Sequence, residues 1–271
     1  MHQEPRRDAE REFLTDEWRY LARAGVLNDF EAIWRQDIGW FEEPNQRRGG
    51  WSGVSRFEVR LPDGRNTAVF IKRQQNHVTR TWRHPFFGIT TFRREFENLQ
   101  WLKAAGVPTL DVLYFAEREV DRERQAILIS RELTGYASLE DCMLRWQQHG
   151  FPERPVWHQL IHQLAGIARQ MHRHHIQQNC FLPKHVFIGG LDSQIDIRLI
   201  DFEKAKRTLT VERAMLRDLD TFNRRSPGLR ATDWLRFLLA YCGQDHVDAR
   251  VRSVWRQLTV RMLKKQGRRK Q

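Results

Sequence analysis

Three absences narrow the class of protein that this sequence encodes. The 271 residues contain only three cysteines, Cys142, Cys180 and Cys242, which lie far apart and form no Cys-x-x-Cys pair. This spacing argues against a disulfide framework and against a zinc knuckle. No apolar run approaches the roughly 18 residues of a transmembrane helix, and the charged N-terminus, MHQEPRRDAEREF, lacks the apolar stretch of a secretory signal. We therefore expect a cytoplasmic protein with reduced cysteines, which can still attach peripherally to a membrane.

Acidic residues are also scarce relative to basic ones. The chain has 34 Asp and Glu against 46 Lys and Arg, so the formal net charge is +12 and the pI is about 10.2. Such a balance favours anionic partners, namely phosphorylated sugars, an anionic membrane surface or nucleic acid. Nucleic acid is the least favoured of the three, because the basic residues are spread over the whole chain and form no single stripe.

The first residues are expected to form a short helix that begins at Arg11 and ends near Gly25. Leu14, Trp18 and Leu21 recur at i, i+4 and i+7, the spacing of one helix face. Because the pattern changes at Trp40, we expect residues 1–39 to be a helical N-terminal extension.

From Trp40 to Arg73 the hydrophobic pattern has a period of two. The segment SRFEVRL places Phe57, Val59 and Leu61 on one side, Asp63-Gly64 supplies a turn, and TAVFIKR follows as a second strand. Before this hairpin, RRGGWSGVS concentrates Gly49, Gly50 and Gly53 in one short segment.

A helix is predicted after this hairpin, capped by Thr90 or Thr91 and ending at Gly106 with Pro108 just beyond. Two strand-like runs follow, TLDVLYFA and QAILISREL, and then two helical ones, SLEDCMLRWQQ and VWHQLIHQLAGIARQMHRHH. The segment from Glu212 to Leu263 is again mostly helical.

This order predicts an α+β fold of two lobes. We expect a small antiparallel, strand-rich N-lobe over residues 40–133 and a larger helical C-lobe over residues 134–263. A basic tail, residues 264–271, would follow.

One strand and one helix carry a pair of opposite charges. Lys72 alternates onto the inward side of its strand with Ala68 and Phe70, where a lysine is costly to bury without an anionic partner. Glu95 shares its helix face with Phe92 and Leu99, so its carboxylate should point toward the sheet. A strand lysine paired with a helix glutamate positions the ATP phosphates in kinases. A lysine that reaches solvent from an edge strand is the structural alternative.

Asp201 follows a short apolar strand, IRLI, and precedes a polar loop. An aspartate there suits Mg²⁺, which takes hard oxygen ligands from one or two carboxylates and from phosphates. Taken alone, such a residue is more often a turn or helix cap. Its place after the glycine segment, the lysine and the glutamate favours the metal.

These segments together resemble a known family. The ordered strings RRGGWSGVSRFEV, IKRQ, TFRREFENLQ, NCFLPKHVFI and LIDFEKAK are similar to those of the lipopolysaccharide core heptose/Kdo kinase and InaA family of Gram-negative bacteria, which has a protein-kinase-like fold. The resemblance covers residues from about Trp40 to Phe222, most of the chain.

The resemblance implies a phosphotransferase that uses ATP and Mg²⁺ to phosphorylate a sugar hydroxyl of the lipopolysaccharide inner core. It implies that the glycine segment and the ion pair hold the phosphates, that Asp201 holds the metal, and that backbone groups of Glu132 and Leu133 meet adenine. The implied nucleotide-binding residues are Gly49, Gly50, Gly53, Lys72, Glu95, Glu132 and Leu133.

The chain departs from the kinase pattern in the catalytic loop. In H-R-D-x-x-x-x-N the aspartate acts as base and the asparagine binds metal. A gap-free match places Cys180 at the aspartate and His185 at the asparagine, whereas a shift of one residue brings Asn179 to the aspartate. Lys184 could stabilise the transferring phosphate, and His185 could contact metal or phosphate. Neither Cys180 nor Asn179 replaces a carboxylate base well.

Three further groups of residues have separate expected roles. The basic, aromatic loop with Arg80, Trp82, Arg83 and His84 is expected to bind the acceptor, an anionic glycolipid or phosphorylated sugar. His172, His174 and His175 end a helix, where histidines suit the helix dipole, so a metal site there is disfavoured. Asp218 and Asp220 lie in RDLDTF; a similar aspartate in kinase-like folds braces the catalytic loop, so a structural role is expected.

We therefore expect an ATP- and Mg²⁺-dependent kinase acting on a lipopolysaccharide sugar at the cytoplasmic face of the inner membrane, with basic residues near anionic lipid. The alternative is a pseudokinase or stress-response scaffold with weak or no phosphoryl transfer, since the catalytic aspartate is not evident.

Overall fold

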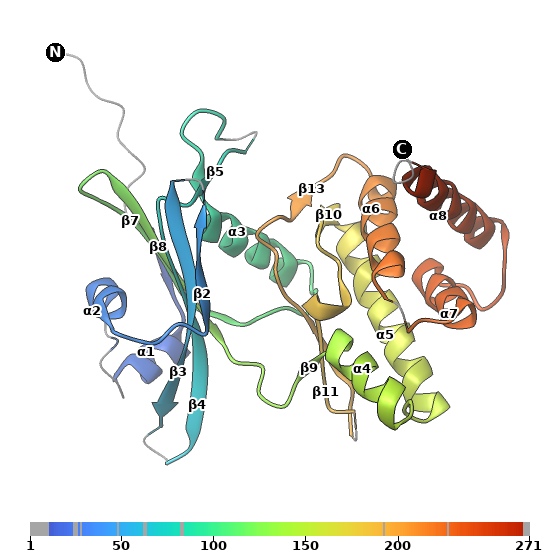
Figure 1. The fold of residues 1–271 in the computed structure, drawn as a ribbon, viewed down its shortest axis with the longest axis horizontal. Coiled ribbons are helices and arrows are strands. Elements are labelled where there is room, and N and C mark those ends of the chain that lie inside the picture. Colours follow the sequence, from blue (N-terminus) through green and yellow to red (C-terminus); the bar gives the residue numbers. More distant parts are fainter. Residues whose placement is uncertain are drawn as a thin grey trace. The chain divides into compact units, whose positions relative to one another are not determined.

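Residues 11–23, 27, 29–47, 49–61, 64–81, 84–191, 193–226 and 228–267 are described by a computed structural model (Figure 1). The chain divides into two units: unit 1 is Met1–Leu99 with Leu110–Leu133, and unit 2 is Gln100–Thr109 with Thr134–Gln271. Unit 1 is built on an antiparallel sheet and unit 2 is mainly helical, which confirms the predicted α+β fold class.

Unit 1 contains a six-stranded antiparallel sheet in the order β1-β7-β8-β4-β3-β2. The predicted hairpin forms β3 and β4, and every residue from Trp51 to Arg60 pairs with β4 without a bulge. The strands of this sheet are β1 (Arg11–Leu14), β2 (Glu42–Arg47), β3 (Gly50–Arg60), β4 (Asn66–Gln75), β7 (Val112–Val120) and β8 (Glu123–Arg131). A two-stranded sheet, β5 (Val78–Thr79) with β6 (Ile89–Thr90), precedes helix α3 (Thr91–Ala104).

Residues from Arg11 onward are part of this sheet and its core. Arg11–Leu14 is a strand that pairs with β7, so the prediction of a helix from Arg11 is wrong for these four residues. The helix α1 (Asp16–Arg23) starts later and buries Trp18 and Leu21, as expected from their spacing. Gly25, where the helix was predicted to end, lies outside the described residues.

The two faces of the sheet are covered by different helices (Figure 1). Helices α1 and α2 (Phe30–Arg35) cover the face that carries Val69 and Ile71 of β4, and α3 covers the other face. Because side chains alternate along a strand, Lys72 lies on the α3 face. The core on the α1 and α2 side includes Trp18, Leu21, Phe30, Ile33, Val59, Val69, Ile71, Ile127 and Ile129.

A buried arginine joins the segment after α2 to this sheet. Arg73 of β4 donates to the backbone carbonyls of Trp34 at 3.0 Å and Gln36 at 2.8 Å, and its guanidinium lies 4.8 Å from the centre of the Trp40 ring. The segment that precedes β2 is therefore fixed on the face opposite Lys72.

Unit 2 consists of helices with short strand pairs between them. The helices are α4 (Leu139–His149), α5 (Arg154–Arg173), the 3₁₀ turn η1 (Pro183–His185), α6 (Val211–Arg224), α7 (Ala231–Cys242) and α8 (Ala249–Gly267). The strands are β9 (Ala137–Ser138), β10 (Ile176–Gln177), β11 (Val186–Gly189), β12 (Asp196–Leu199) and β13 (Lys206–Arg207). Helix α8 includes Lys264 and Lys265 and continues to Gly267, so part of the segment expected as a tail is helical.

The core of unit 2 contains a run of aromatic rings next to the predicted catalytic loop. Phe181 stacks on Phe222 of α6 with ring centres 4.8 Å apart, and Phe222 stacks on Phe237 of α7 at 5.8 Å. Since Phe181 directly follows Cys180 and is fully buried, this stack anchors the loop in the helical core. Within the part of the chain that the structure describes, none of the helices is long and apolar enough to span a bilayer.

Candidate active site

An ion pair joins β4 to α3 in unit 1. Lys72 Nζ donates to Glu95 Oε1 at 2.7 Å. Glu95 is 2% exposed, so its carboxylate depends on protein groups for its hydrogen bonds. The alternation of β4 and the helix periodicity of α3 thus bring together the two residues that the sequence pairs.

The first turn of α3 is fixed against β4 by a short polar network. Gln74 Oε1 accepts the Thr91 hydroxyl at 2.7 Å and the backbone N–H of Phe92 at 2.9 Å. Thr90 caps the helix, because its hydroxyl accepts the N–H of Arg93 at 3.2 Å. Of the two predicted capping residues, Thr90 is therefore the one used, and the network sets the position of Glu95 relative to Lys72.

The three glycines of the β2–β3 hairpin have different environments. Gly49 lies in the turn with φ of +77°, a conformation that favours glycine, and has open space around it. Gly50 lies against the backbone of Gln75 and Asn76. At Gly53 a Cβ would overlap the indole ring of Trp40, so this glycine allows Trp40 to cross the strand. Because Gly53 pairs with Arg73, that contact is on the face opposite Lys72.

The segment after β8 was expected to present backbone groups to adenine. The N–H of Glu132 donates to the carbonyl of Ala68 at 3.0 Å, which extends the pairing of β8 with β4. The Glu132 carboxylate accepts two hydrogen bonds from Arg56, at 2.6 Å from Nε and 2.9 Å from Nη2. The N–H of Glu132 is thus already used, and Leu133 is half-buried just after it.

In unit 2 the predicted catalytic loop is braced by a buried aspartate. Asp218 of α6 is fully buried, and its two carboxylate oxygens accept the backbone N–H groups of Gln178 at 2.7 Å and Asn179 at 3.0 Å. His172 Nε2 lies 3.4 Å from the same carboxylate, while its Nδ1 lies 2.9 Å from the Tyr241 hydroxyl. The structural role expected for Asp218 is confirmed by these contacts.

The side chain of Asn179 is engaged away from Cys180. Its amide donates to the backbone carbonyl of Lys204 at 2.8 Å and its oxygen accepts from Gln177. The backbone of Asn179 has φ of +68°, in the left-handed region. Both ends of the amide are therefore occupied by protein groups.

Cys180 is a half-buried free thiol. Burial, and after it the negative charge of Asp201, raises the pKa of the Cys180 thiol above its ordinary value. The thiol is consequently protonated at neutral pH and does not act as a base there.

His185 lies between the loop and Asp201. Its Nδ1 is 2.8 Å from the backbone carbonyl of Cys180, and its Nε2 is 3.3 Å from Asp201 Oδ2. The Asp201 side chain remains 30% exposed. Its carboxylate, beside the His185 imidazole, is therefore accessible to a cation. This donor set fits Mg²⁺ only with phosphate or water oxygens added, since magnesium prefers oxygen ligands. Lys184, next to His185, is exposed.

The other predicted residues are those expected to bind the acceptor and the histidines near the end of α5. Arg80 is exposed, and the N–H of His84 donates to the carbonyl of Thr81 at 3.1 Å; Trp82 and Arg83 lie outside the described residues. His172 is buried against Asp218, whereas His175 contacts the carbonyl of Thr208. Across the described residues, no three His, Cys, Asp or Glu side chains are placed to share a metal ion.

Comparison with known proteins identifies the family. The model of the lipopolysaccharide kinase (Kdo/WaaP) family matches residues 31–241, which is most of the chain and includes Lys72, Glu95, Cys180 and Asp201.

This chain belongs to the lipopolysaccharide kinase (Kdo/WaaP) family.

Two curated relatives support this assignment. The chain is 24% identical to Protein InaA of Escherichia coli K12 over 214 residues, which is 79% of this chain and 95% of the relative. It is 30% identical to the lipopolysaccharide core heptose(I) kinase WaaP of Pseudomonas aeruginosa over 159 residues, 55% of this chain and 58% of that protein. A solved structure of WaaP in complex with acyl carrier protein matches the fold with a TM-score of 0.67 and 22% identity, covering 94% of this chain and 97% of that chain.

Sequence reasoning in this Kdo/WaaP family member missed two residues that hold the site in place. Arg56 fixes the Glu132 side chain, and Gln74 fixes the start of α3. Strand alternation places both on the α3 face with Lys72. Polar residues on an inward-facing strand position are the signal that would have found them.

Proposed function

We propose that this protein is an ATP- and Mg²⁺-dependent phosphotransferase that acts on a sugar hydroxyl of the lipopolysaccharide inner core. The observation that supports this most is the 2.7 Å pair between Lys72 and the buried Glu95, on which the nucleotide phosphates would be held. Asp201, with His185 beside it, would hold Mg²⁺, which neutralises charge on the β and γ phosphates.

In this reaction the sugar oxygen forms a bond to the γ-phosphorus, and the bond to the β–γ bridging oxygen breaks. The products are a sugar phosphate ester and ADP, and the hydroxyl proton passes to water. Such a transfer has a loose transition state and depends mainly on positioning and charge neutralisation. The chain can therefore transfer phosphate without a carboxylate at Cys180, at a reduced rate.

A pseudokinase scaffold is the second candidate, and one observation favours it. The thiol of Cys180 is protonated at neutral pH, and the amide of Asn179 is occupied by Gln177 and Lys204. Neither side chain serves as a general base, which ordinarily contributes about 10²–10⁴-fold to the rate.

Binding and hydrolysis of Mg-ATP separate the two candidates. We expect the parent to bind ATP in a Mg²⁺-dependent manner, with binding weakened at least about tenfold by Lys72→Ala and Asp201→Asn. Lys103→Ala and Asp111→Asn are matched controls, because both side chains are exposed. A parent that binds no nucleotide would exclude the phosphotransferase. Transfer of the labelled γ-phosphoryl group from ATP to partially dephosphorylated lipopolysaccharide inner core then identifies the acceptor class.

The acceptor is expected to be a membrane glycolipid, and one loop supports contact with an anionic membrane surface. Phe86 and Phe87 lie in a turn and are 80% and 83% exposed. Arg124 donates to the backbone carbonyls of Phe87 at 3.2 Å and Gly88 at 3.1 Å, which holds the turn in place. Two adjacent exposed aromatic side chains near basic groups are typical of an interfacial anchor.

Co-sedimentation with vesicles containing anionic phospholipid tests this contact. We expect Phe86→Ser with Phe87→Ser to reduce the bound fraction several-fold, whereas Leu209→Ser, which removes another highly exposed apolar side chain, leaves it unchanged. Equal binding of all three proteins would exclude the loop as the anchor. Arg80 and His84 remain proposed as acceptor contacts in the same segment of the chain.

A further inference from the structure

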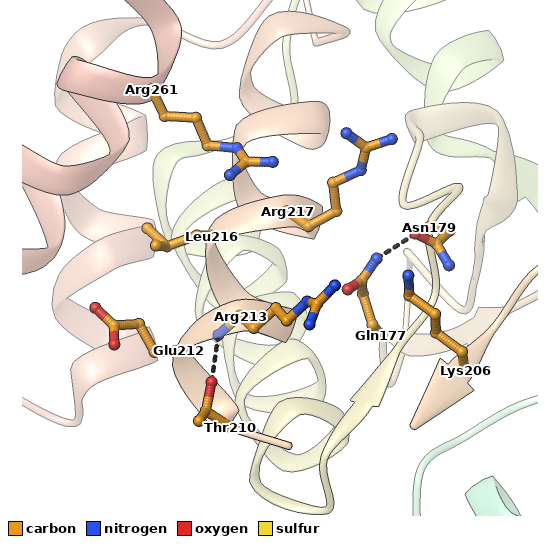
Figure 2. A pocket seen from close by; sticks show the side chains of 9 residues that line it. All are labelled: Gln177, Asn179, Lys206, Thr210, Glu212, Arg213, Leu216, Arg217 and Arg261. Carbon is orange, nitrogen blue, oxygen red and sulfur yellow. Dashed lines mark hydrogen bonds between the residues drawn. The ribbon is translucent and has the colours of Figure 1, made fainter. Parts of the chain in front are cut away.

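A basic pocket lies beside the predicted catalytic loop within unit 2 (Figure 2). Its volume is about 530 Å³, which falls in the ~300–1,000 Å³ range of small-molecule sites. Four cations and one carboxylate line it, together with two amides, a hydroxyl and a leucine. The lining residues are Gln177, Asn179, Lys206, Thr210, Glu212, Arg213, Leu216, Arg217 and Arg261.

The cations come from three elements that the chain brings together. Arg213 and Arg217 are four residues apart on α6, so they share one helix face. Lys206 lies on β13, which pairs with β10 at Gln177, and Arg261 comes from α8. Figure 2 shows the charged ends of Arg213 and Lys206 directed toward the amide of Gln177.

These charges are poorly neutralised by the protein. Among the described residues, no carboxylate lies within 4.0 Å of a charged nitrogen of Lys206, Arg213 or Arg217. Arg261 differs, because its Nε lies 3.5 Å from Asp220 Oδ2. The chain is basic throughout, so exposed cations are common in it. Like charges gathered around a hollow repel one another unless an anion occupies it.

The pocket is lined by Asn179, the residue that precedes the one at the position of the kinase base. The amide of Asn179 lines the pocket, and the next residue is Cys180, whose Cα is about 3.8 Å further along the chain. Asp218 fixes the backbone of Asn179 at 3.0 Å, so this wall of the pocket is held by the same contact as the loop. An anion bound here lies next to the segment that would meet the acceptor.

We propose that this pocket binds a phosphate monoester on the acceptor, carried by a sugar unit next to the one that receives the γ-phosphoryl group. This inference rests on the proposed function and adds the substrate's own phosphate to it. Two guanidinium groups on consecutive helix turns suit a phosphate, which offers three oxygens and nearly two negative charges. The volume leaves room for the sugar ring, and the amide of Gln177 and the hydroxyl of Thr210 can bind its hydroxyl groups.

Calorimetric titration of the full chain with four probes at low ionic strength tests this proposal. The probes are glucose 6-phosphate, inorganic phosphate, glucose and glucuronate. We expect glucose 6-phosphate to bind at least about tenfold more tightly than each of the others, because only it combines a dianionic phosphate with a ring. Equal affinity for inorganic phosphate or for glucuronate would overturn the proposal.

Variants locate the binding site. The double variant Arg213→Gln/Arg217→Gln is expected to weaken glucose 6-phosphate binding by about ten- to a hundredfold, as charge-assisted hydrogen bonds are lost. Arg225→Gln/Arg256→Gln removes the same charge from exposed positions of the same unit and should leave binding unchanged. Lys206→Gln provides a second pocket variant, and thermal unfolding checks that each protein is folded. Unchanged affinity in both pocket variants contradicts the assignment.

ATP binding is measured with the same protein preparations. Lys72→Ala is expected to lose ATP binding and to keep glucose 6-phosphate binding. The parent itself could fail to bind ATP and still bind glucose 6-phosphate through Arg213 and Arg217. That result would exclude the proposed kinase function and would support the pocket assignment. A parent that binds ATP but not glucose 6-phosphate would exclude only the proposed role of the pocket.

Discussion

The carboxylate of Asp218 accepts the backbone N–H of Asn179 at 3.0 Å. The second oxygen accepts the N–H of Gln178 at 2.7 Å, so the loop is held by two adjacent amides just before Cys180. With the Asn179 side chain turned to Gln177 and Lys204, this arrangement supports the gap-free match, in which Cys180 occupies the position of the kinase aspartate.

The bracing role of Asp218 leads to a prediction about loop stability. Asp218→Asn leaves one oxygen for two backbone donors and places an amide N–H₂ against the other, so we expect a loss of about 1–3 kcal/mol in unfolding free energy. Hydrogen exchange at the amides of Gln178 and Asn179 should accelerate. Asp111→Asn, at an exposed position, is the control. Unchanged exchange at these two amides would show that the loop is held by other contacts.

A second prediction concerns the stability that the Lys72–Glu95 pair gives to the fold. Lys72→Met removes the 2.7 Å partner and leaves a carboxylate that is 2% exposed without it. We expect a loss of about 1–3 kcal/mol in chemical denaturation, and restoration of most of it by Lys72→Met/Glu95→Gln, which removes the buried charge. A double variant no more stable than Lys72→Met would contradict a direct pairing.

A third prediction concerns acid stability. Burial alone would raise the pKa of Asp220, but hydrogen bonds from Arg224 and Lys265 outweigh it and hold this pKa below its ordinary value of 3.8. The Arg224 contact lies within α6, and the Lys265 contact joins α6 to α8. The stability that these contacts give is full above that value and is lost as the pH falls below it. Asp220→Asn should therefore lower stability at pH 7 and flatten its fall below about pH 4. A parallel pH curve in parent and variant would contradict this.

Much of the fold follows from local patterns. The period-two alternation around Phe57 and Val59 predicts β3, and the spacing of Phe92, Glu95 and Leu99 predicts α3 with its charge directed at the sheet. Both elements are long enough for the hydrophobic period to repeat several times, so the pattern identifies the type of element. The pairing of Lys72 with Glu95 followed because each residue lies on an inward face that could be identified separately.

Other features depend on contacts between distant residues. Arg11–Leu14 is a strand because it pairs with Tyr114 to Glu117 of β7, a partner that local spacing does not reveal. Gly53 looked like a phosphate-binding glycine, but the structure adds a packing reason for it in the ring of Trp40. The pocket near Asn179 collects residues as far along the chain as Arg261. No local pattern links these positions.

The central claim is a kinase-like site in which one carboxylate is replaced by a thiol at Cys180. The most direct test is the initial rate of γ-phosphoryl transfer from Mg-ATP by Cys180→Asp to a partially dephosphorylated lipopolysaccharide inner core, which keeps a phosphate monoester on a neighbouring sugar. We predict a rise of at least about tenfold over the parent, toward the ~10²–10⁴-fold that a general base supplies, with no rise for Cys180→Asn, which has the same shape without the charge. No gain in Cys180→Asp, or an equal gain in Cys180→Asn, would contradict the account.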